Sequence, residues 1–62
     1  MKILIVDDSP TIRAALRGLV DKMGHSVIEA DDGAKALKSY QQDRPDLVLI
    51  DVRTVQIGRA HV

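Results

Sequence analysis

Three aspartates stand directly after two apolar runs of this 62-residue chain. Asp7 and Asp8 follow the run at residues 2–6, and Asp51 follows the run at residues 47–50. Short apolar runs that end abruptly in carboxylates are typical of buried parallel strands, which deliver polar groups to the carboxyl edge of a sheet. If the two strands are neighbours, the three carboxylates converge at that edge.

A cluster of three acids predicts a bound cation. Two carboxylates about 4 Å apart repel each other by roughly 4 kcal/mol at an effective dielectric constant of about 20. A positive charge among them relieves this repulsion, and carboxylate oxygens are ligands that the hard ion Mg²⁺ prefers. We therefore expect Asp7, Asp8 and Asp51 to form a magnesium site.

The elements that must position these residues follow one another in the order β-α-β-α-β. Apolar and β-branched runs predict strands at 2–6, 26–30 and 46–50, and apolar side chains at helical spacing predict helices at about 10–23 and 34–42. Right-handed crossovers then imply a parallel sheet with helices on its faces. The first and third strands are the most apolar, so we expect the strand order 2-1-3.

Local signals delimit the helices. Ser9 followed by Pro10 predicts a capped start, and Gly24 predicts a left-handed end. We expect two apolar stripes to pack on the sheet. Their members are Ile12, Ala15, Leu16, Leu19, Val20 and Met23 in the first helix, and Ala34, Leu37 and Tyr40 in the second.

Composition narrows the function classes. Nine basic and nine acidic residues leave no net charge, and without a basic stripe we expect no direct binding of nucleic acid. Cysteine is absent, which excludes thiolate metal sites and fits a reducing cytoplasm. No run approaches the roughly 20 apolar residues that span a bilayer. We expect one small, soluble, cytoplasmic domain that does not contact membranes.

The remaining acidic and histidine residues favour structural interpretations. Asp31 and Asp32 precede a glycine, which is ordinary turn chemistry. Asp43 and Asp46 flank the entry to the third strand, where we expect them to be solvated. His25 has no second metal ligand nearby in sequence.

From Met1 to about Arg53 the chain resembles the receiver domain of two-component response regulators. The resemblance rests on Ile-Leu-Ile-Val-Asp-Asp-Ser-Pro at 3–10, Glu-Ala-Asp-Asp-Gly-Ala at 29–34 and Pro-Asp-Leu-Val-Leu-Ile-Asp at 45–51. It implies a flavodoxin-like α/β fold with five parallel strands and five helices. This chain would hold the truncated N-terminal part, a three-stranded sheet of order 2-1-3 with two helices.

The resemblance also implies a function and residue roles. Such a domain is a regulatory phosphoacceptor, not an enzyme, and receives its phosphoryl group from a histidine kinase or phosphotransfer protein. Asp51 would be the phosphoacceptor and form an acyl phosphate. Asp8 would bind Mg²⁺ directly and Asp7 mainly through water, while Asp51 and the Arg53 backbone carbonyl would complete the protein ligands. The ion would neutralise charge on the transferring group.

The match to the family pattern stops after Arg53. Thr54 and Val55 stand where the family usually has Met-Pro, and no lysine follows Lys38. The family's later lysine, which contacts the phosphoryl group, and its later hydroxyl residue, which couples phosphorylation to conformation, therefore have no counterpart. We expect the 62-residue chain by itself to be inactive, to bind Mg²⁺ weakly or not at all, and to aggregate through its third-strand edge.

Three alternatives differ in class. An aspartyl-phosphate phosphatase or phosphotransferase commonly carries Asp-x-Asp after its first strand, which the adjacent Asp7 and Asp8 do not match. A nucleotide-binding domain would need Gly-x-Gly-x-x-Gly or a phosphate loop, and neither motif is present. The third alternative is a non-functional truncated gene product.

The tail at 57–62 predicts an origin outside the gene. Ile-Gly-Arg-Ala-His-Val is encoded by one frame of a widely used sequencing-library adapter, ATC GGA AGA GCA CAC GTC, whose next codon is the stop TGA. The adapter bases before ATC are AG, which fits a Gln56 codon ending in AG. We therefore predict that residues 57–62 are adapter read-through. Sequencing the genomic locus checks this, because native DNA that encodes these residues followed by further coding sequence or a different stop would contradict it.

Overall fold

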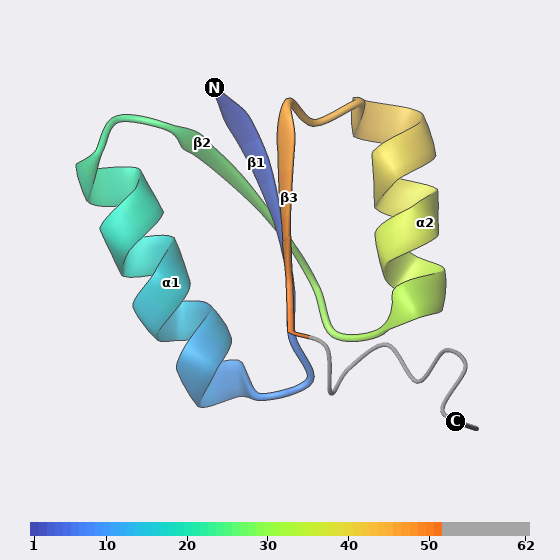
Figure 1. Ribbon diagram of the computed structural model, residues 1–62, viewed down its shortest axis with the longest axis horizontal. Coiled ribbons are helices and arrows are strands. Elements are labelled where there is room, and N and C mark those ends of the chain that lie inside the picture. Colours follow the sequence, from blue (N-terminus) through green and yellow to red (C-terminus); the bar gives the residue numbers. More distant parts are fainter. Residues whose placement is uncertain (52–62) are drawn as a thin grey trace, which may run out of the picture.

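The computed structural model describes residues 1–51, in which one parallel sheet lies between two helices (Figure 1). Each predicted element is present. In chain order they are β1 (Lys2–Val6), α1 (Pro10–Lys22), β2 (Ser26–Ala30), α2 (Gly33–Asp43) and β3 (Leu47–Ile50). This α/β arrangement confirms the fold class expected from the sequence.

The sheet has the order β2-β1-β3, and both strand pairs are parallel. Ile5 of β1 is opposite Glu29 of β2 on one side and Leu49 of β3 on the other. The predicted order is therefore confirmed, and the most apolar strand is central. Because all three strands run in one direction, their carboxyl ends share one edge of the sheet.

The central strand is buried on both faces. Ile3 and Ile5 pack against Val20 of α1, while Leu4 and Val6 belong to a second cluster on the face that α2 covers. Alternate side chains of a strand point to opposite faces, so a strand between two helix layers must be apolar at every position. This is why residues 3–6 form an uninterrupted apolar run.

The apolar stripe of α1 covers the sheet only in part. Val20 is buried and Leu16 packs partly against the core. Ile12, Leu19 and Met23, which we expected to face the sheet, are exposed by 38, 60 and 69%. The stripe prediction is wrong for these three side chains and for Ala15, which is also exposed, because the stripe is wider than the row along which α1 meets a sheet of three strands.

The second helix also presents a different side to the sheet from the one predicted. Ala36 packs against the core, whereas Leu37 and Tyr40 are exposed by 59 and 47%. No residue of Gly33–Asp43 is buried. The helix therefore contributes little apolar burial to the fold.

The predicted helix ends are confirmed. Ser9 Oγ accepts a hydrogen bond from the Ile12 backbone N–H at 3.3 Å, and Gly24 has the left-handed φ of 87° that ends the first helix. The second helix ends at Asp43, and the following Arg44 has a left-handed φ of 49°. Neither α1 nor α2 is long and apolar enough to cross a membrane, and these are the helices of residues 1–51.

Candidate metal centre

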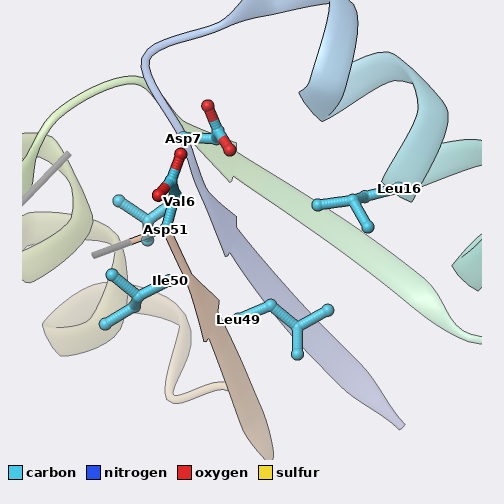
Figure 2. Close-up of a pocket in the computed structure, with 6 residues that line it drawn as sticks. All are labelled: Val6, Asp7, Leu16, Leu49, Ile50 and Asp51. Atoms are coloured by element: carbon cyan, nitrogen blue, oxygen red, sulfur yellow. The ribbon is translucent and has the colours of Figure 1, made fainter. Parts of the chain in front are cut away.

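The three aspartates singled out in the sequence lie together at the carboxyl edge of the sheet. Asp7, Asp8 and Asp51 each offer a carboxylate oxygen, and these oxygens lie within 4.8 Å of one another. Figure 2 shows the carboxylates of Asp7 and Asp51 beside each other, just beyond the ends of β1 and β3. The predicted convergence of the carboxylates is confirmed.

Backbone pairing sets this geometry. The Asp51 N–H donates to the Val6 carbonyl at 3.1 Å, and the Asp7 N–H donates to the Ala30 carbonyl at 3.1 Å. Both aspartates therefore continue the hydrogen-bond ladder by one residue beyond the strands. Their positions are fixed by the parallel register and not by loop conformation.

The three carboxylates differ in exposure. Asp7 is 2% exposed, Asp51 is half-buried and Asp8 is exposed. A buried carboxylate needs hydrogen-bond partners, and Asp7 Oδ1 accepts from the Ser9 backbone N–H at 2.8 Å. Asp7 is thus held against the protein, while the edge beside Asp8 faces solvent.

The donor set fits a hard divalent cation. It consists of carboxylate oxygens, which suit Mg²⁺, and its negative charges gain from a cation among them. Two ligands of one Mg²⁺ lie at most about 4.2 Å apart, because each bond is about 2.1 Å long. Small side-chain rotations would therefore let Asp7, Asp8 and Asp51 share one ion. Arg53, whose carbonyl was expected to be a further ligand, lies outside the described residues.

A pocket adjoins the acidic cluster. Its volume is about 210 Å³, and its lining includes Asp7 and Asp51 together with Leu16 of α1 and Leu49 of β3 (Figure 2). The carboxylate of Asp51 is therefore accessible from a space with an apolar floor. A nucleophilic role needs such access.

The other acidic residues have structural roles. Asp32 Oδ1 caps α2 by accepting from the Lys35 N–H at 2.8 Å, and the Asp31 carboxylate pairs with Lys35 Nζ at 3.0 Å. Both observations agree with the expected turn. Asp46 is exposed, as expected, and it also accepts a hydrogen bond from the Lys2 backbone N–H at 2.8 Å, which joins the starts of β1 and β3.

His25 and Asp43 lie at the opposite end of the strands from the acidic cluster. His25 Nδ1 is 2.9 Å from the N-terminal nitrogen of Met1, and the Asp43 carbonyl accepts from Lys2 Nζ at 2.9 Å. Within residues 1–51, neither side chain belongs to a group of three residues that could hold a metal.

One charged cluster, formed by Arg13, Arg17 and Glu29, was not predicted from the sequence. Both arginines pair with Glu29 of β2: Arg13 Nε lies 3.1 Å from Oε1, and Arg17 Nη1 contacts Oε2. These hydrogen bonds, first from Arg17 and then from Arg13, lower the pKa of Glu29 below its ordinary value of 4.5. The sequence did contain a sign of this cluster. Glu29 is two residues from the apolar Val27, so its side chain lies on the same face of the strand as Val27.

The ion pairs of Glu29 with Arg13 and Arg17 predict that the stability of the fold decreases in acid. A lowered folded-state pKa makes the contribution of Glu29 to stability fully present above its unfolded-state pKa, and that contribution is lost as the pH falls through the folded-state pKa. We expect the free energy of unfolding to fall below about pH 4.5, and to fall less steeply in Glu29→Gln. Denaturant unfolding followed by circular dichroism across this pH range measures both. Identical pH profiles for the two proteins would contradict the expectation.

Comparison with known proteins identifies relatives of the chain. The family model of the response regulator receiver domain matches residues 3–57. Protein PilH of Pseudomonas aeruginosa is 43% identical over 51 residues, covering 82% of this chain and 42% of PilH. The alkaline phosphatase synthesis transcriptional regulatory protein PhoP of Bacillus subtilis is 43% identical over 51 residues, covering 82% of this chain and 21% of PhoP.

A third relative has an enzymatic name. Protein-glutamate methylesterase/protein-glutamine glutaminase 3 of Hahella chejuensis is 45% identical over 53 residues, covering 84% of this chain and 15% of that protein. The chain thus spans less than half of the length of each of these relatives. The similarity belongs to a segment that proteins with differently named activities share.

Proposed function

Because this chain belongs to the receiver domains of two-component response regulators, we propose that it is the phosphoacceptor part of such a domain, with Asp51 as the acceptor. The observation that supports this most is the position of Asp51. It follows β3 directly, lies within reach of two further carboxylates and lines a pocket. A receiver domain is a regulatory domain, and we assign no enzymatic activity to this chain.

The chemistry is a transfer between nucleophiles. An Asp51 carboxylate oxygen attacks the phosphorus of a phosphohistidine, the O–P bond forms, and the P–N bond breaks with its electron pair returning to the imidazole. The product is an acyl phosphate on Asp51. Asp7 also lines this pocket, but it is 2% exposed and its carboxylate accepts a hydrogen bond from the Ser9 backbone N–H, so the half-buried Asp51 is the better placed acceptor.

The neighbouring aspartates hold the cation. Asp8, which is exposed, binds Mg²⁺ directly, and Asp7, which is buried and hydrogen-bonded to Ser9, acts mainly through water. Asp51 would supply a further ligand, and so would the backbone carbonyl of Arg53, a residue outside the described part of the chain. Bound Mg²⁺ supplies charge neutralisation for the transferring phosphoryl group.

The partner in the parent protein's pathway is a histidine kinase or a phosphotransfer protein in the cytoplasm. This segment has no net charge, and we assign it no contact with nucleic acid. What the parent protein does with the phosphoryl group depends on sequence beyond this segment, as the differently named relatives illustrate. The rival proposal is a truncated product without function.

A chimera tests the assignment. Residues 1–51 replace the matched segment of Protein PilH, and the purified chimera is treated with acetyl phosphate and Mg²⁺. We expect phosphorylation that is lost in Asp51→Asn, because the amide cannot form the acyl phosphate, and that survives in the control Asp43→Asn. Robust phosphorylation of the Asp51→Asn chimera, measured by intact mass, would refute the assignment.

A further inference from the structure

Arg13 connects the acidic cluster to the neighbouring strand. Its Nη1 donates to the Asp7 carbonyl oxygen at 2.8 Å, and its Nε donates to Glu29 Oε1 at 3.1 Å. The side chain is 19% exposed, so most of it is held between α1 and the sheet. One guanidinium therefore joins α1, the end of β1 and the middle of β2.

Strand register places the Glu29 side chain on the face of the sheet that α1 covers. Glu29 is opposite Ile5, whose side chain packs on the α1 face. The other acceptor, the Asp7 carbonyl, is a backbone group directly after the end of β1, on the strand beside Glu29. The fork of an arginine on α1 can reach both acceptors at once, because they lie diagonally across adjacent strands.

With the contact from Arg13, the backbone N–H, the carboxylate and the backbone carbonyl of Asp7 each make a hydrogen bond. The Asp7 N–H is bound by Ala30, and its carboxylate by the Ser9 N–H. Its carbonyl, however, precedes Asp8 and lies where β1 has ended, beyond the ladder. Arg13 supplies the donor at this point, and so fixes the peptide that sets the direction in which Asp8 leaves the strand.

We propose that Arg13 is a positioning residue that orients the Asp7–Asp8 corner and thereby sets the Mg²⁺ affinity of the acidic cluster. The inference rests on the proposed function of that cluster. Glu29 has two roles in this arrangement. It aligns the guanidinium, and it offsets a positive charge that would otherwise oppose a cation beside Asp7.

The geometry requires arginine. Its planar fork donates in two directions from one rigid group, whereas a lysine ammonium is a single point on a flexible stem. Lysine at this position keeps the charge but can satisfy either the Asp7 carbonyl or Glu29. Arg17 is the matched control, because it pairs with the other oxygen of Glu29 and its side chain is 58% exposed.

The test compares Arg13→Lys with Arg17→Lys in the chimera in which residues 1–51 replace the matched segment of Protein PilH, because the isolated chain is expected to associate and to bind Mg²⁺ weakly. Mg²⁺ is titrated against ¹⁵N-labelled protein, and unfolding is measured in parallel. We expect Arg13→Lys to weaken Mg²⁺ binding roughly tenfold, as loss of a group that orients metal ligands typically does, and Arg17→Lys to leave the Kd nearly unchanged. If the two variants bind Mg²⁺ equally well, the inference is wrong.

A metal-free measurement separates this inference from the proposed function. In Arg13→Lys, the amide signal of Asp8 should shift and hydrogen exchange at the Ser9 amide should speed up, whereas Arg17→Lys should change neither. If the chimera without these substitutions binds no Mg²⁺ but these spectral changes occur, the proposed magnesium site is wrong and the positioning role of Arg13 is supported. Identical metal-free spectra at Asp8 and Ser9 in both variants would overturn the positioning role.

A second variant covers the case in which Arg13→Lys does not fold. Glu29→Gln keeps the size of the side chain but removes the charge that aligns Arg13. We expect weaker Mg²⁺ binding than in wild type and a shift of the Asp8 amide in the same direction as in Arg13→Lys. A wild-type Kd together with an unshifted Asp8 amide would contradict the role of the pair.

Discussion

The isolated 62-residue chain is expected not to persist as a stable monomer. Within residues 1–51, β3 pairs with β1 and has no strand on its other side. Leu47 and Ile50 of this strand are exposed by 42 and 51%. An apolar strand with unpaired backbone groups is a template for pairing with another chain, so we expect self-association.

The small core offers little resistance to this outcome. Leu4, Ile5 and Val6 are the large side chains that are fully buried in the described part of the chain, and α2 buries no residue. In a chain of this size, the gain from apolar burial and the loss of conformational entropy nearly cancel even when the core is complete. Here neither helix covers its face of the sheet fully, so the balance favours unfolding or association.

Sedimentation velocity and urea unfolding measure the effect. Leu47→Lys should shift the population towards monomer, because a charged edge side chain discourages strand pairing. Leu37→Lys is the matched control, since Leu37 is 59% exposed but lies on α2, and it should leave association unchanged. A wild-type chain that sediments as a monomer and unfolds cooperatively would overturn the prediction.

Phosphorylation of the isolated chain should be much slower than that of the chimera with PilH. The sequence contains no lysine after Lys38, so it lacks a counterpart of the later lysine that contacts the transferring phosphoryl group in the receiver family. Removing one such preorganised group typically slows a reaction by roughly a hundredfold or more. We expect a loss of at least this size, together with weak Mg²⁺ binding.

Intact-mass measurements over time with acetyl phosphate give the phosphorylation rates of the isolated chain and of the chimera. Any phosphate that the isolated chain acquires should be on Asp51, so its Asp51→Asn variant should acquire none. Asp43→Asn serves as the control for a change of charge. Equal rates for the isolated chain and the chimera would show that the N-terminal segment alone carries the full reaction.

The element order and the acidic cluster were determined by the sequence alone. The continuous apolar run at residues 3–6 indicates a strand buried on both faces, and the structure places it at the centre of the sheet. Asp7 and Asp51 follow strands that had to be parallel, because a helix crosses between successive strands. Local signals were sufficient here, since parallel neighbours bring their carboxyl ends to one edge.

The roles of individual helix and strand side chains were decided only by the tertiary structure. Helical spacing grouped Leu19 with Val20, but the position of α1 on the sheet buries Val20 and leaves Leu19 exposed by 60%. Likewise, nothing in the sequence near Arg13 indicated a partner for its side chain. In the structure, the register of β2 places Glu29 beside it. Periodicity specifies which side chains share a helix face, whereas contact also depends on the distance and rotation between elements, which are set by long-range packing.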